Sequence, residues 1–181
     1  MRAALRRHML ETRDNGFIPE GSVIEGFEIA RNAKAYPLEN ILLTADTAIN
    51  RDATNLPRLR HWLGDENECV RYWAALGCVM LRDKAGPAAD ALAVRLRDPS
   101  GSVRVAAAEA LCQMGREREA LAVLQKCLVQ DKNPWIRLQS VNALQNIGSK
   151  ALPALPAIEK AVSDDSDYVR RAARYTAAAV K

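Results

Sequence analysis

The sequence contains few of the residues that build metal or redox sites. It has four cysteines and two histidines among 181 residues. The two histidines lie far apart, and the cysteines form no CxxC pair. Because a zinc site needs clustered thiolate and imidazole ligands, this pattern predicts no bound metal, and we expect no cofactor.

Short motifs of the common enzyme classes are also missing. The sequence has no Gly-x-Gly-x-x-Gly, no Gly-Lys-Ser/Thr and no Gly-x-Ser-x-Gly, which argues against dinucleotide-binding, P-loop and α/β-hydrolase chemistry. No apolar run is long enough to span a bilayer as a helix, and no apolar segment follows the basic N-terminus. We therefore expect a non-catalytic chain with no membrane partner and no signal peptide. The localisation stays open.

Aromatic residues are scarce, at 5% of the chain, whereas hydrophobic residues make up 49% and charged residues 27%. Small apolar side chains, many of them alanine, favour closely packed helices over a β-sandwich. The net charge of +4 permits an anionic partner but is small for binding driven by phosphates. Nucleic acid is therefore the last-ranked partner.

The sequence does contain an internal repeat. A Val/Ile-Arg dipeptide recurs with a constant period of 33, and an aspartate column and two apolar columns keep the same spacing. The dipeptides are Val70-Arg71, Val103-Arg104, Ile136-Arg137 and Val169-Arg170. Four columns in register indicate a repeat architecture, which takes priority over any single motif.

Each unit is expected to be a pair of helices joined by a tight turn. In the second unit the turn is Asp98 to Ser102, with Pro99 and Gly101 as helix breakers. The following helix places an apolar residue at intervals of three and four positions from Val103 to Met114. Because one pair cannot bury both its faces, the pairs must stack, which predicts an all-α fold, an α-solenoid of short helical pairs. The cysteines are read as small core residues.

The stretch from Asp98 to Leu111 resembles the HEAT repeat in its short variant, and the resemblance extends over residues 54–181. We divide the chain into residues 1–36, an irregular and helical N-terminal segment; residues 37–53, a degenerate capping half-repeat; and residues 54–181, four repeats. Within the first segment we expect helices over Ala3–Glu11 and Ser22–Ala30.

The co-repeating aspartates and arginines have two interpretations. HEAT-like stacks imply a structural ladder, in which an aspartate caps a helix and holds the arginine of a neighbouring repeat. The alternative is an arginine stripe that binds anions. The residues concerned are Asp65, Asp98, Asp131 and Asp164 with Arg71, Arg104, Arg137 and Arg170.

The second helix of each unit has three positions that face away from the predicted core. They are polar or small in most units and read as solvated, but the first unit has an apolar triplet there, which needs a cover. The N-terminal segment folding back is one cover, and another domain or protein is the other. The interaction candidates are Trp73, Leu76, Met80, Glu109, Gln113, Gln139, Asn142, Asn146 and Tyr175.

The N-terminal segment shows a second resemblance. His8, the stretch Glu11 to Glu20 and Tyr36 to Glu39 are similar to the end of the catalytic region of bacterial sulfatase-type hydrolases, of the arylsulfatase or heparan N-sulfatase-like kind. In that group a HEAT-like tail follows, so the resemblance implies an accessory tail. None of the four cysteines lies in the Cys-x-Pro/Ala-x-Arg motif that becomes formylglycine, so the chain alone should not cleave a sulfate ester.

Three functions remain open at this stage. The first is a non-catalytic module of a sulfatase-like hydrolase that acts in domain packing, with its own catalytic domain or another protein as partner. The second is a free-standing scaffold for protein interaction, and the third is a nucleic-acid module. The sequence leaves open the identity of the partner, the oligomeric state and whether Met1 is the natural start.

Overall fold

The computed structural model describes residues 1–180, which form helices joined by short turns, with no β-strand in that range. The helical elements in chain order are α1 (Arg2–Thr12), α2 (Phe27–Arg31), α3 (Leu38–Ile49), η1 (Ala53–Asn55), α4 (Leu56–Trp62), α5 (Glu68–Leu81), η2 (Arg82–Ala88), α6 (Ala89–Arg95), α7 (Gly101–Gln113), α8 (Glu117–Gln130), α9 (Pro134–Asn146), η3 (Gly148–Ala154), α10 (Leu155–Ala161) and α11 (Asp167–Val180). No helix within residues 1–180 is both long and apolar enough to cross a membrane.

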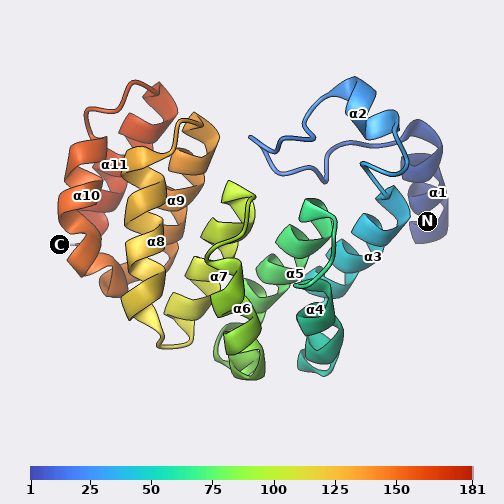
Figure 1. Cartoon of the computed structure of the whole chain (residues 1–181), viewed down its shortest axis with the longest axis horizontal. Coiled ribbons are helices and arrows are strands. Elements are labelled where there is room, and N and C mark those ends of the chain that lie inside the picture. The colour runs from blue at the N-terminus through green and yellow to red at the C-terminus, as the bar shows by residue number, and fades with distance from the viewer. Residues whose placement is uncertain (181) are drawn as a thin grey trace.

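From α3 onward the helices form two stacked layers (Figure 1). Helices α3, α5, α7, α9 and α11 pack successively in one layer, here called the inner layer, and α4, α6, α8 and α10 form the outer layer. Each outer helix packs on the inner helix that follows it in sequence. The predicted all-α solenoid of helical pairs is confirmed.

Proline determines whether an outer helix begins with a long 3-10 segment. Pro87 and Pro153 lie inside the 3-10 segments that precede α6 and α10, so those α-helices contain only 7 residues each. Proline lacks the N–H that an α-helix interior requires. Helix α8 has no proline and runs uninterrupted for 14 residues.

A continuous core of small and medium apolar side chains connects the four repeats. Helix α7 contributes mostly alanines to it, which allows its neighbours to pack closely. All four cysteines are free and buried. Burial raises the pKa of Cys78 to about 12, so its thiol stays protonated and behaves as a core side chain.

Residues 13–36, here called the strap, cross the inner-layer side of the molecule (Figure 1). Arg13, the first residue of the strap, bonds to its last part. The guanidinium donates to the carbonyl oxygens of Ala30 at 2.8 Å and Tyr36 at 2.7 Å. The Tyr36 hydroxyl donates to the Asp14 carbonyl at 2.8 Å. A small second core joins the strap to α3 and α5.

The expected helix over Ser22–Ala30 is wrong for its first half, because α2 begins only at Phe27. The Ser22 side chain accepts the N–H of Ile24 at 3.1 Å, which stabilises a turn. Gly26 then has a φ of 132°, a conformation outside the helical region. The strap therefore crosses the inner layer as turns and irregular chain.

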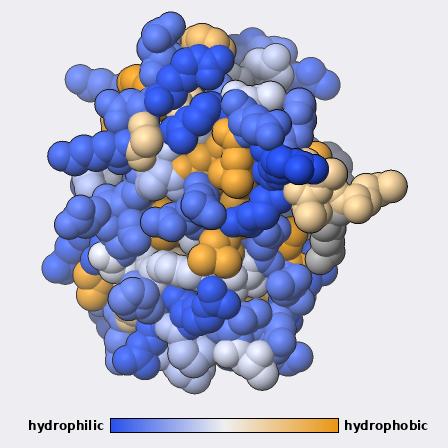
Figure 2. All heavy atoms as spheres, turned by 90° about the vertical axis from the view of Figure 1, so that its right-hand side faces the viewer, coloured by the Kyte–Doolittle hydropathy of each residue, from blue (hydrophilic) through white to orange (hydrophobic). Residues whose placement is uncertain are grey.

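The N-terminal end of the solenoid is formed by α1, α2 and α3. Apolar atoms interrupt the mostly hydrophilic surface of this end (Figure 2). Exposed apolar residues of these three helices are Leu5, Phe27, Ile29, Leu43 and Ile49.

Candidate functional site

The aspartates and arginines that share the period of the repeat lie along one ridge of turns. Arg71 donates from Nε and Nη2 to both carboxylate oxygens of Asp98 at 2.8 Å, and from Nη1 to the carbonyl oxygens of Asp65 and Glu66. The same Asp98 accepts the N–H of Ser100, the residue that precedes α7, at 3.0 Å. One arginine thus joins its own turn to the turn of the next repeat, 27 residues later.

The pairs of this ladder differ in burial. The Arg71 and Asp98 side chains are 8% and 0% exposed, whereas those of Arg104 and Asp131 are 24% and 20% exposed. Arg137 pairs with Asp164 at 2.8 Å, and this guanidinium helps to lower the pKa of Asp164 against the opposing effect of burial.

The ladder ends at the two terminal repeats. Within residues 1–180 no arginine pairs with Asp65, because Leu38 occupies the corresponding position of the preceding helix. Arg170, at the other end, bonds to the carbonyls of its own turn and to Asp167 on its own helix. These partners leave no row of free arginines for an anion stripe along the ridge.

The apolar triplet of α5 meets the strap at Trp73. The indole N–H donates to the Phe17 carbonyl at 3.0 Å, and the two rings lie 5.9 Å apart. Leu76 is half-buried and packs against the repeat core, and Met80 is half-buried as well. The strap thus contacts the top of the triplet directly.

Side-chain donors of the inner layer also reach the strap's main chain. Gln139 donates to the Glu20 carbonyl at 3.0 Å, and Asn133 donates to the Gly21 carbonyl at 3.0 Å. Gly21 has a φ of 79°, and a Cβ there would lie 2.6 Å from the Asn133 amide nitrogen. A side chain at position 21 would therefore disturb this contact.

The prediction that Glu109 is solvated is wrong, because only 8% of this residue is exposed. Its carboxylate accepts one hydrogen bond, from Asn146 Nδ2 at 3.0 Å. Burial raises its pKa to about 7, and the Asn146 bond lowers it less. The Gln113 Oε1 atom, one turn further along α7, is buried without a hydrogen-bond partner, as is the Ser102 hydroxyl on the same helix.

Tyr72 of α5 lies beside Trp73, with the two ring centroids 5.9 Å apart. Burial, followed by the charges of Glu109 and Glu20, raises the pKa of Tyr72 to about 12. The hydroxyl therefore stays protonated at neutral pH.

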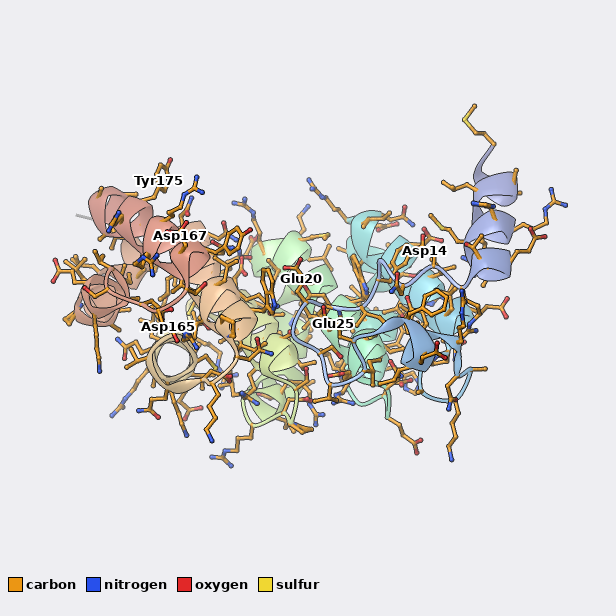
Figure 3. The ribbon with its side chains drawn as sticks, turned by 90° about the horizontal axis from the view of Figure 1, so that it is seen from above. Asp14, Glu20, Glu25, Asp165, Asp167 and Tyr175 are labelled. Carbon is orange, nitrogen blue, oxygen red and sulfur yellow. The ribbon has the colours of Figure 1, made fainter. Side chains whose placement is uncertain are left out.

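The remaining interaction candidates lie toward the C-terminal repeats. Asn142 and Asn146 are exposed on α9, and Tyr175 is 65% exposed on α11. Figure 3 places Tyr175, Asp165 and Asp167 at one end of the upper surface. It places Asp14, Glu20 and Glu25 on the strap. The structure therefore brings Trp73 and Gln139 to the strap, joins Asn146 to Glu109, and leaves Tyr175 exposed on α11.

A cavity of about 530 Å³ separates part of the strap from the ridge of turns. Val23, Ile24 and Lys34 line it on one side, and residues 65–68 with Pro99 and Ser100 line it on the other. The strap is therefore not packed against the repeats along its whole length.

The sequence contained no direct signal for several residues that hold the strap. No motif or repeat column singles out Arg13, Asn67 or Asn133, yet Asn67 donates to the Ala35 carbonyl at 2.8 Å. Their common feature is a donor side chain beside a turn, which is frequent in any chain. Only a fold that brings residues 112 positions apart together, as Asn133 and Gly21 are, gives them this role.

Comparisons with known proteins match part of the repeats in sequence and nearly the whole chain in fold. Residues 89–178 match a family model described as HEAT repeats. An engineered protein of known crystal structure is similar over 99% of this chain and 82% of its own, with 16% identity and a TM-score of 0.58. A designed armadillo repeat protein in complex with the peptide (KR)4 is similar over 99% and 83%, with 20% identity and a TM-score of 0.58. No curated protein sequence matches.

Proposed function

We propose that this HEAT/armadillo-like repeat protein is a non-catalytic scaffold that binds an extended segment of another protein on its inner layer. The observation that carries the proposal is the set of donors directed at main-chain carbonyls. Trp73, Asn133 and Gln139 each hold a carbonyl of the strap. Every polypeptide has such carbonyls, so these donors suit an extended chain whatever its side chains.

The inner layer also has the composition of a binding face. Trp73 supplies an aromatic surface, and the exposed amide of Asn142 supplies adaptable hydrogen bonds. Aromatic residues surrounded by polar groups are typical of protein interfaces. The designed armadillo neighbour carries a bound peptide, which supports a protein partner for a fold of this kind.

Peptide selection tests this function without a known partner. A random dodecapeptide library displayed on phage would be selected on the full chain, and dissociation constants would be measured for the enriched peptides. We expect values of about 1–100 µM, typical of short extended ligands. Asn142→Trp, which places a bulky ring on the inner layer, should weaken these peptides at least 5-fold.

The matched control is Gln130→Trp, at the exposed end of the outer helix α8. It adds the same ring on the other layer and should leave the affinities unchanged. Peptides that tolerate Asn142→Trp as well as they tolerate the control would contradict an inner-layer scaffold.

A second candidate function is the accessory tail of a sulfatase-like hydrolase. The resemblance of residues 11–20 and 36–39 to the end of a sulfatase catalytic region favours it. Arg13 and Tyr36, which belong to these two stretches, hold each other in the strap. Immunoblotting of source cells with an antibody to this chain tests the idea. A band well above the 19.9 kDa of this chain supports it, and a band near that mass contradicts it.

A further inference from the structure

We infer that the tip of the strap, residues 20–25, is an autoinhibitory self-ligand: it occupies the path of the partner segment on the inner layer and must lift before that segment binds. The inference rests on the proposed scaffold function, because it names the regulation of the same surface. Any event that loosens the tip should then raise the affinity for the partner.

The strap already uses the donors that the scaffold would offer to a partner. Trp73 on α5, Asn133 immediately before α9 and Gln139 within α9 each donate to a strap carbonyl at 3.0 Å. Helix α7 lies between α5 and α9 in the inner layer (Figure 1), so the strap runs across three consecutive helices. An extended partner that bonds to the same donors cannot lie there at the same time, because two chains cannot fill the same space.

The tip is held to α9 through its main chain rather than through its side chains. Asn133 and Gln139 both bond to backbone carbonyls. Half of the tip residues are exposed, and 86% of Val23 is accessible; the exposed residues are Glu20, Val23 and Glu25. Bonds to main-chain carbonyls do not depend on the sequence of the bound chain, so a partner segment can replace them.

The tip is also poorly packed against the repeats. The cavity of about 530 Å³ lies between Val23 and Ile24 on one side and the ridge of turns on the other. Ser22 bonds to Glu68, which lines this cavity, and Ile24 is half-buried against the small second core. Few contacts therefore oppose lifting of the tip, which is typical of a segment that opens locally.

The base of the strap is anchored and would stay in place. Arg13 bonds to the carbonyls of Ala30 and Tyr36 and so closes residues 14–29 into a loop. Ala30 and Tyr36 are 2% and 0% exposed in the second core. Gly26, just after the tip, has a φ of 132°, and nothing lies within 4 Å of a Cβ there. A glycine in open space permits backbone rotation, so the tip can move while the base holds.

A reversible covalent lock tests the inference. Gly21→Cys combined with Asn133→Cys brings two thiols together. A Cβ at position 21 lies 3.0 Å from the Asn133 Cγ atom, whose place the second sulfur would take. A disulfide requires about 3 Å between a Cβ and the sulfur of the partner cysteine, so the bond can form with the tip closed.

The probes are cysteine-free dodecapeptides from the phage selection, labelled with fluorescein and titrated against the full chain by fluorescence anisotropy. The oxidised double variant keeps the tip closed and should bind them about 10-fold more weakly than the same protein after reduction. Because the two states share one sequence, loss of the Asn133 donor affects both equally. Gly21→Cys alone is the matched control and should bind equally in both redox conditions.

The native cysteines should not interfere with the lock. All four are buried, and burial raises the pKa values of Cys69, Cys78 and Cys112 to about 12. These thiols stay protonated and unreactive. Mass spectrometry identifies the new disulfide, and the affinity of the wild type should not respond to the reductant.

Gly21→Ala opens the tip without a covalent bond. A Cβ at position 21 lies 2.6 Å from the Asn133 amide only while the tip is closed, so the substitution favours the open state and leaves the donors free. For a tip that is closed in most molecules, the apparent affinity rises in proportion to the open fraction. The dissociation constants should fall by about 5–10-fold, the factor by which exchange of the strap amides accelerates. Gly86→Ala is the control and should change neither quantity.

Two results would overturn the inference: equal affinity of the oxidised and reduced double variant, or an unchanged affinity of Gly21→Ala despite faster exchange of the strap. Either result leaves the scaffold proposal intact if the peptides remain sensitive to Asn142→Trp. Insensitivity to Asn142→Trp removes the scaffold proposal by itself.

Discussion

The ladder of turns and the strap are both held by hydrogen bonds, but the bonds differ in kind. In the ladder, a buried guanidinium meets a buried carboxylate, as in Arg71 and Asp98. In the strap, neutral amide or indole groups meet main-chain carbonyls, as in Gln139 and Glu20. Loss of a ladder arginine leaves a buried charge behind, whereas loss of a strap donor leaves a carbonyl that water can reach. The repeats should therefore unfold as one unit, and the strap should open locally.

The largest effect is expected where the ladder is most buried. Arg71→Ala removes a bidentate partner from Asp98, whose side chain has no exposure. Arg95 remains at 3.2 Å and compensates in part. We expect the free energy of unfolding to fall by about 3 kcal/mol, measured by urea denaturation.

Arg104→Ala is the matched comparison. The side chain of its partner Asp131 is 20% exposed and receives one bond from Arg104, at 3.1 Å, so water can replace the arginine. The free energy of unfolding should fall by about 1 kcal/mol. Equal losses for the two variants would show that burial does not set the strength of the ladder.

The ladder and the strap also differ in how far the sequence predicts them. The constant period of the repeats predicted the ridge, because each rung repeats the same residue types at the same separation. The strap has no repeat, and its partners lie up to 119 residues away, as Gln139 and Glu20 do. Long-range pairing of common residue types leaves no periodic trace in one sequence.

Glu109 shows how the lack of a sequence signal for long-range contacts affects the site. The helical period predicted that it faces away from the core, yet it is buried on α7. The period says nothing about what packs over that side, so the expected solvation was wrong. The face of a helix on which a residue lies follows from the sequence, whereas its burial against residues of other helices, as Glu109 against Asn146, requires the tertiary structure.

A smaller, local effect is expected at the tip of the strap. Gly21→Ala forces a residue with a Cβ into a φ of 79° and against the Asn133 amide. Hydrogen exchange of the strap amides should become about 5–10-fold faster, equivalent to about 1 kcal/mol, while the urea midpoint of the repeats stays within error.

Gly86→Ala is the control for this substitution, since nothing lies within 4 Å of a Cβ at that position. It should change neither exchange nor the urea midpoint. A fall in the urea midpoint for Gly21→Ala alone would mean that the strap and the repeats unfold together, and the distinction between the two regions would not hold.

The smallest effect is expected from a single strap donor. Gln139→Ala removes the 3.0 Å bond to the Glu20 carbonyl, and that carbonyl then turns to water. Such a bond contributes about 0.5 kcal/mol net, so exchange of the amides near Glu20 should accelerate about 2-fold. Gln145→Ala, at an exposed residue of the same helix, serves as the control and should leave exchange unchanged.

Because the strap is held by several weak donors at separate points, loss of one should loosen the region around Glu20 without releasing Trp73 from Phe17. An effect of Gln139→Ala as large as that of Gly21→Ala would instead indicate one cooperative attachment, which a partner segment would have to displace as a whole.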